Sequence, residues 1–227
     1  MSEARPVPEA SGTSHVTLVT GFDAYNGAEV NPSGEIARAL DGTTIGGLGV
    51  VGRVFPVSAA RTPELLRAAI DEVDPEVVLM FGVWPGRAVF SIERVAVNVL
   101  DFPYPDNEGA QLVDAPVLEG GPAAYLSTVP VKAVVEAWRA AGIPGAVSET
   151  AGTYLCNQSF YAVLDHTSSR DVPVGFVHIP TVPSEASRKD PPQASLPLTT
   201  LVEGAKVALE AIAATRRAEN RAAAPTT

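Results

Sequence analysis

The chain has 227 residues, of which 46% are hydrophobic and 19% charged, so it is long enough to bury the core of one domain. Its net charge of −10, without a cluster of lysines and arginines, argues against nucleic acid or an anionic membrane as a partner. The single cysteine excludes an intramolecular disulfide, and no apolar run approaches the roughly 20 residues of a membrane span. Because residues 1–8 lack a basic and apolar leader, we expect a cytoplasmic protein.

Short β-branched runs alternate with helical patterns along the chain. Strands are predicted at residues 15–20, 49–57, 75–83, 89–99, 144–150 and 172–180, and helices at residues 34–40, 63–73, 131–141, 156–166 and 198–217. Continuous apolar runs are typical of strands buried on both faces, so the pattern predicts an α/β fold with a mostly parallel sheet flanked by helices. We expect a single domain over residues 15–217, with disordered ends at residues 1–14 and 218–227.

Residues 100–122 break this alternation, because proline, aspartate, asparagine and glycine follow one another there without periodicity. Loops of this length in a compact domain are commonly functional or disordered. We favour a functional loop, and a solvated excursion is the alternative.

Cys156 lies at the start of the predicted helix 156–166. The first turn of a helix presents free N–H groups and the positive end of the helix dipole, which would lower the thiol pKa from its usual value of about 8.5. The same amides could hold an oxyanion. The alternative is an inert core thiol that shares an apolar stripe with Phe160, Val163 and Leu164, since free cysteines are commonly buried.

A nucleophilic cysteine needs a base, and the chain has three histidines. His15 precedes the first strand, and His166 lies about 15 Å from Cys156 along the same helix. His178 comes at the end of a buried strand, at the edge where open α/β sheets place their sites. It is the favoured base, and a structural histidine is the alternative.

Glu93 and Arg94 interrupt the apolar run at residues 89–99, where a charge is costly unless it has a partner. Glu93 is the expected partner of His178. The alternative is an ion pair between Glu93 and Arg94 themselves. The chain has too few histidines and cysteines for a zinc site, so we expect neither a metal nor another cofactor.

Several segments resemble, in the same order, the pyroglutamyl-peptidase I (pyrrolidone-carboxylate peptidase) family. They are VTGFDAYNGAEVNPS, SIERVAVNV, PDNEG, GGPAAYLSTVPVKAVV, SETAGTYLCNQSFY, GFVHIP and LTTLVEGAKVAL. The resemblance implies a three-layer α/β/α sandwich around a twisted, mostly parallel mixed sheet, in subunits often assembled as a homotetramer. It also implies a triad with Cys156 as nucleophile, His178 as base and Glu93 as acid.

The implied reaction is that of a thiol protease, hydrolysis of the amide bond after an N-terminal pyroglutamate. The substrates would be N-terminally blocked peptides or small amides. A small neutral lactam calls for an apolar aromatic pocket with few polar contacts. The resemblance and the neighbouring loop place in that pocket the side chains of Phe22, Tyr25, Asn31, Val83, Trp84, Tyr154 and Leu155.

The departures from the family pattern surround the same pocket. Tyr25 replaces a phenylalanine, Trp84 and Pro85 replace small residues ahead of Arg87, and Pro103 replaces an arginine. We expect Trp84 to obstruct the pocket and to weaken or shift the preference for pyroglutamate. Two alternatives stay open: an amidase of the same fold for another small acyl or lactam group, and a binding protein that has kept the triad without activity.

Overall fold

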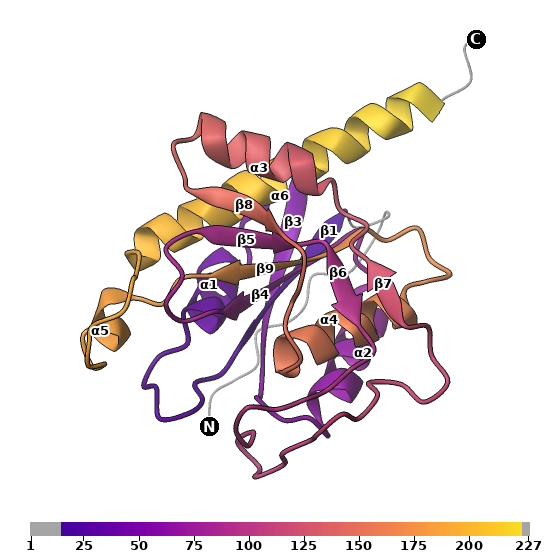
Figure 1. Ribbon diagram of the computed structural model, residues 1–227. Helices are drawn as coiled ribbons and strands as arrows, with labels where there is room; N and C mark the ends of the chain where they lie inside the picture. Colours follow the sequence, from indigo (N-terminus) through magenta and orange to yellow (C-terminus); the bar gives the residue numbers. More distant parts are fainter. Residues whose placement is uncertain (1–14, 224–227) are drawn as a thin grey trace, which may run out of the picture.

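The computed structural model describes residues 15–223, which form a seven-stranded sheet covered by helices on both faces (Figure 1). The strands of the sheet are β1 (Val16–Phe22), β2 (Thr44–Ile45), β3 (Leu48–Phe55), β4 (Val77–Val83), β5 (Phe90–Glu93), β8 (Gly145–Ser148) and β9 (Val174–Ile179). The helices are α1 (Pro32–Leu40), α2 (Thr62–Val73), α3 (Val131–Ala140), α4 (Leu155–His166), α5 (Pro183–Ala186) and α6 (Leu198–Ala223).

The sheet has the strand order β2-β3-β1-β4-β9-β5-β8. Strands β3, β1, β4 and β9 are parallel neighbours, so their carboxyl ends meet at one edge. β5 and β8 run parallel to each other, and β5 pairs with β9 in the antiparallel sense. The prediction of a mostly parallel mixed sheet within an α/β/α sandwich is confirmed.

Two hydrophobic cores join the sheet to its helices. Figure 1 shows α3 and α6 on one side of the sheet and α2 and α4 on the other. The first core includes Trp138, whose indole N–H donates a 2.8 Å hydrogen bond to the carbonyl of Gly204. The second core includes Phe160 and Phe176. Every residue of β9 is buried, because the strand lies between the two cores, and this explains its continuous apolar run.

The structure corrects two of the predicted boundaries. The run at residues 89–99 is not one strand: β5 ends at Glu93, and β6 (Val95–Val97) forms a separate small sheet with β7 (Ala124–Leu126). Helix α6 continues to Ala223, because residues 218–223 are mostly good helix formers without glycine or proline. The predicted disorder of residues 218–223 is therefore wrong, and the predictions for residues 1–14 and 224–227 lie outside the described residues.

Over residues 15–223, none of the helices is both long enough and apolar enough to cross a membrane.

Candidate active site

The candidate site lies at the edge of the sheet where β4 and β9 end. Gly82 of β4 pairs with His178 of β9 in the parallel register. Helix α4 approaches the same edge and carries Cys156 in its first turn. Cys156 and His178 both line a cavity of about 290 Å³. The structure therefore brings the predicted nucleophile and the predicted base to one opening at the carboxyl edge of the parallel strands.

Glu93 and His178 form a buried pair. The Nδ1 atom of His178 lies 2.8 Å from Oε1 of Glu93, and the two side chains are 3% and 0% exposed. Ser91 is opposite His178 in the antiparallel β5–β9 register, so Glu93 lies diagonally across the strand pair, within reach of the imidazole. Arg94 instead binds the carboxylate of Glu149 at 3.0 Å. The alternative of an ion pair between Glu93 and Arg94 is therefore wrong.

The surroundings of His178 keep its ring neutral. Burial lowers the pKa of the imidazole below its ordinary value, the positive charge of Arg87 lowers it further, and Glu93 opposes both effects. The second carboxylate oxygen of Glu93 is buried and has no hydrogen-bond partner among the described residues. A neutral His178 is able to accept a proton, and the resulting cation would lie beside a carboxylate that has few other partners.

The thiol of Cys156 departs from the sequence expectation. Burial and the nearby charge of Glu93 raise the pKa of Cys156 to about 12. The backbone amide at the start of the helix does lower this pKa, as predicted, but loss of hydration and a negative neighbour outweigh it, so the predicted net lowering is wrong. The thiol therefore keeps its proton at neutral pH, and its reaction requires a base at the moment of attack.

Gly82 is a site residue that the sequence analysis missed. A Cβ atom at this position would lie 2.7 Å from Sγ of Cys156 and 2.8 Å from Cζ of Phe176. Only a glycine leaves room for the sulfur beside the strand pair that carries His178. The available signal was a glycine inside the apolar run of β4, since a glycine within a strand often marks a close approach.

The predicted substrate-binding residues line two adjoining cavities. The larger one, of about 290 Å³, is bounded by Tyr25, Val83, Trp84 and Tyr154 among the predicted residues. Phe22, Asn31 and Leu155 line only a smaller cavity of about 20 Å³, which also reaches Cys156.

Asn31 has a structural task beside that smaller cavity. Its Oδ1 accepts hydrogen bonds from the backbone N–H and the hydroxyl of Ser33, at 3.1 and 2.8 Å, and this caps α1. Its Nδ2 donates to the carbonyl of Asp23 at 2.9 Å. The polar atoms of Asn31 therefore hold the loop after β1 in place, and this loop carries Tyr25 to the larger cavity.

Three tyrosines form one wall of the larger cavity. The ring centroid of Tyr104 lies 6.3 Å from that of Tyr25 and 5.0 Å from that of Tyr154. Burial raises the pKa of each of the three phenols, so they are neutral hydrogen-bond donors at neutral pH. Tyr104 and the neighbouring Pro103 come from residues 100–122, so this loop contributes to the site as the functional interpretation expected.

Trp84 bounds the larger cavity without filling it. Its ring meets the ring of His178 edge to face, with centroids 4.8 Å apart and an interplanar angle of 81°. The space of about 290 Å³ remains beside it. Trp84 therefore leaves space in the pocket, and its effect on the preference for pyroglutamate stays a prediction.

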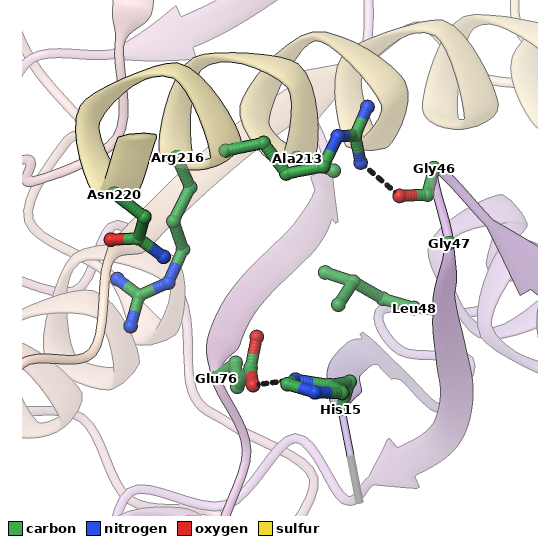
Figure 2. Close-up of a pocket in the computed structure, with 9 residues that line it drawn as sticks. His15, Gly46, Gly47, Leu48, Glu76, Ala213, Arg216 and Asn220 are labelled. Atoms are coloured by element: carbon green, nitrogen blue, oxygen red, sulfur yellow. Dashed lines mark hydrogen bonds and ion pairs between the residues drawn. The ribbon is translucent and has the colours of Figure 1, made fainter. Parts of the chain in front are cut away.

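A separate cavity, of about 500 Å³, lies at the opposite edge of the sheet, where His15 precedes β1 and Leu48 begins β3 (Figure 2). Charged groups in its wall bind one another or the backbone: His15 pairs with Glu76, and Arg217 donates to the carbonyl of Gly46. Its lining contains no cysteine, serine or threonine. We therefore place the candidate chemistry in the cavity of Cys156.

A thiol in the first turn of a helix and a buried imidazole–carboxylate pair at a sheet edge are the groups that an α/β cysteine hydrolase needs. The model of the pyroglutamyl peptidase family matches residues 15–215. The chain therefore belongs to the pyroglutamyl peptidase family, whose members are cysteine peptidases.

Individual relatives agree with this assignment. The pyrrolidone-carboxylate peptidase of Bacillus cereus strain G9842 is 43% identical over 195 residues, which cover 85% of this chain and 90% of that protein. That of Escherichia fergusonii is 47% identical over 171 residues, 75% of this chain and 80% of that protein.

Solved structures of similar proteins share the fold. The pyrrolidone carboxyl peptidase of Thermococcus litoralis has a TM-score of 0.87 at 33% identity and covers 90% of this chain and 96% of its own. A mutant of the Pyrococcus furiosus enzyme has a TM-score of 0.85 at 37% identity and covers 88% of this chain and 98% of its own.

Proposed function

We propose that this protein hydrolyses the amide bond after an N-terminal pyroglutamate through a Cys156–His178–Glu93 triad. One observation carries the proposal: the buried His178–Glu93 pair, joined at 2.8 Å, opens onto the same cavity as the only thiol of the chain. Membership of the pyroglutamyl peptidase family supports the substrate class.

The first half of the reaction forms a thioester. Glu93 accepts a hydrogen bond from the Nδ1–H of His178, which leaves the lone pair of Nε2 free to take the thiol proton of Cys156. The sulfur attacks the pyroglutamyl carbonyl as this proton moves, because a thiol with a raised pKa does not ionise beforehand. The imidazolium then gives the proton to the leaving amine as the C–N bond breaks.

The second half of the reaction releases the acid. His178 takes a proton from water, the resulting hydroxide attacks the thioester, and the C–S bond breaks with return of the proton to the sulfur. The N-cap residue Tyr154 makes no side-chain hydrogen bond to the start of α4. The amides of that first turn are therefore available to an oxyanion in both halves.

The lining of the cavity of about 290 Å³ that contains Cys156 and His178 suits a neutral acyl group. It contains no aspartate, glutamate, lysine or arginine. A substrate with a free α-amino group would carry a positive charge into this pocket without a carboxylate to receive it. A lactam has no such charge, and the neutral phenols of Tyr25 and Tyr104 are suitable donors for its carbonyl oxygen. The hydroxyl of Tyr154 instead donates to the carbonyl of Pro105 at 3.3 Å.

Matched fluorogenic amides test the substrate class. We expect the pyroglutamyl amide to exceed the prolyl amide in kcat/KM by at least about 10²-fold, because the two rings differ in the lactam carbonyl and in the charge of the ring nitrogen. Glutaminyl and alanyl amides complete the panel. Preference for another small acyl amide would favour the alternative amidase, and no hydrolysis of any member would favour a binding protein.

The lack of room for a Cβ atom at Gly82 leads to a second prediction. Gly82→Ala is expected to lower kcat/KM for the pyroglutamyl amide at least tenfold, because its Cβ would displace Sγ of Cys156 from its place beside the strand pair. Gly49→Ala is the matched control in β3, where a Cβ would make an ordinary contact of 3.6 Å with Val16. Equal activity of the two variants would show that the position of the sulfur tolerates this shift.

The organisation and location of the molecule follow as further proposals. We propose that residues 15–223 form one domain, supported by the single main sheet that both hydrophobic cores share. The resemblance to the family predicts a homotetramer, and a cytoplasmic location is a separate proposal. Light scattering on the purified protein measures the number of subunits.

A further inference from the structure

Trp84 connects His178 to Arg87 through two ring contacts. One is the edge-to-face contact with His178, and the other is with the guanidinium carbon of Arg87, which lies 3.6 Å from the ring centroid. Nη1 of Arg87 also donates a 3.1 Å hydrogen bond to Oγ of Ser91, and Ser91 is the register partner of His178. A closed circuit of contacts therefore runs from His178 through Trp84, Arg87 and Ser91 and back to His178.

A tight turn at residues 84–87 builds this circuit. The backbone N–H of Arg87 donates to the carbonyl of Trp84 at 3.4 Å, and Gly86 has a φ of 85°. Proline at the second position and a glycine of positive φ at the third are the residues of a type II turn, which brings its first and fourth residues together. The N–H of Trp84 donates to the carbonyl of Ile179 at 2.9 Å, which fastens the turn to β9.

We propose that the 84–87 turn positions the imidazole of His178 for proton transfer, with Trp84 in contact with the ring and Arg87 holding Trp84. The proposal rests on the proposed role of His178 as base. Glu93 holds one nitrogen of the imidazole, and Phe176 meets the ring with centroids 5.0 Å apart. Trp84 adds a further contact to the imidazole. Rotation of the imidazole about its hydrogen bond to Glu93 is therefore restricted.

Arg87 has a second effect, through its charge. The titratable and charged groups around His178 are Glu93 from β5, Cys156 from α4 and Arg87 from the turn. Of these, Glu93 raises the pKa of His178 and Arg87 lowers it, while the thiol of Cys156 is neutral. Removal of the Arg87 charge should therefore make the imidazole easier to protonate.

Four variants separate the contact from the charge. Trp84→Leu removes the aromatic ring and Trp84→Phe keeps one. Arg87→Met removes the charge and Arg87→Lys keeps it without the planar guanidinium. Arg53→Met is the matched control, because Arg53 lies on β3, which β1 and β4 separate from β9. For each protein, two assays are run against pH: steady-state kinetics, which give kcat and KM for a pyroglutamyl amide, and alkylation of Cys156 by iodoacetamide, which gives a rate.

We expect Trp84→Leu to lower kcat roughly tenfold with a smaller change in KM, and Trp84→Phe to recover part of the loss. Arg87→Met should move the acid midpoint of both pH profiles upward by roughly half a unit, whereas Arg87→Lys and Arg53→Met should leave it in place. Arg87→Lys should lower kcat several-fold, because the planar contact with Trp84 is lost.

The positioning proposal is overturned if Trp84→Leu retains the native kcat and alkylation rate, or if Arg87→Met and Arg87→Lys both retain the native kcat. A native midpoint in Arg87→Met would reject the charge effect of Arg87. Alkylation needs no turnover, so it still tests the proposal if the protein does not hydrolyse pyroglutamyl amides. Circular dichroism verifies that each variant folds. If the leucine or methionine variant fails to fold, the smaller changes in Trp84→Phe and Arg87→Lys decide, and native kcat values in both would reject the positioning role.

Discussion

Cys156→Ala is expected to lower kcat/KM for a pyroglutamyl amide by about 10⁴-fold or more. The chain contains no second thiol that could take over the attack. The fold should persist, because the pKa of the thiol is raised to about 12 and the substitution therefore removes no charge at neutral pH. Steady-state kinetics measure the loss, and thermal melting followed by circular dichroism measures the stability.

The activity of Cys156→Ala must be compared with that of a buffer blank and of the native protein treated with iodoacetamide. Both the variant and the alkylated protein should reach the same background, because both lack the nucleophile. Turnover of the alanine variant clearly above that background would refute a covalent mechanism at Cys156.

Glu93→Gln is expected to lower kcat/KM by about 10²- to 10⁴-fold. Glutamine has nearly the same shape, but it cannot stabilise an imidazolium by charge, and its amide group can hold the ring in the wrong tautomer. The carboxylate raises the pKa of His178, so its removal lowers that pKa further. The acid limb of the kcat/KM profile should therefore move to lower pH while the plateau falls.

Glu149→Gln is the matched control for this prediction. Glu149 binds Arg94, the neighbour of Glu93 in the chain, and its side chain is 70% exposed. An exposed ion pair contributes little to the stability of the fold, so this variant should keep kcat/KM within about twofold of the native value. If Glu93→Gln changes only the melting temperature, Glu93 is a structural residue and the triad is wrong.

The buried strands and the nucleophile position are the parts of the site that local sequence indicates well. β4 and β9 were predicted as strands because strands between two cores are apolar on both faces. The predicted helix start at Cys156 is one residue after the true start of α4 at Leu155. Both features depend on a few consecutive residues, so a local pattern is sufficient to find them.

The contacts around His178 depend on chain segments that are distant in the sequence. Glu93 and His178 are 85 residues apart, and they meet because β5 enters the sheet antiparallel to β9 in one particular register. A charged residue in an apolar run indicates that it needs a partner, but it does not indicate which one. The choice between His178 and Arg94 was therefore open until strand pairing was known.

At Trp84 and Cys156, the tertiary structure also differs from what the local sequence suggests. A large side chain at a pocket edge suggests obstruction, but the type II turn at residues 84–87 directs the Trp84 ring against His178. The helix end favours a thiolate at Cys156, but burial and Glu93 raise its pKa.

The sequence by itself determined the α/β class, the family resemblance and the residue types available for catalysis, because these follow from local patterns and ordered motifs. The tertiary structure alone decided which of those residues touch, which way their rings face and how readily they ionise. Strand register, packing and desolvation set these properties, and each of them depends on parts of the chain that only folding brings together.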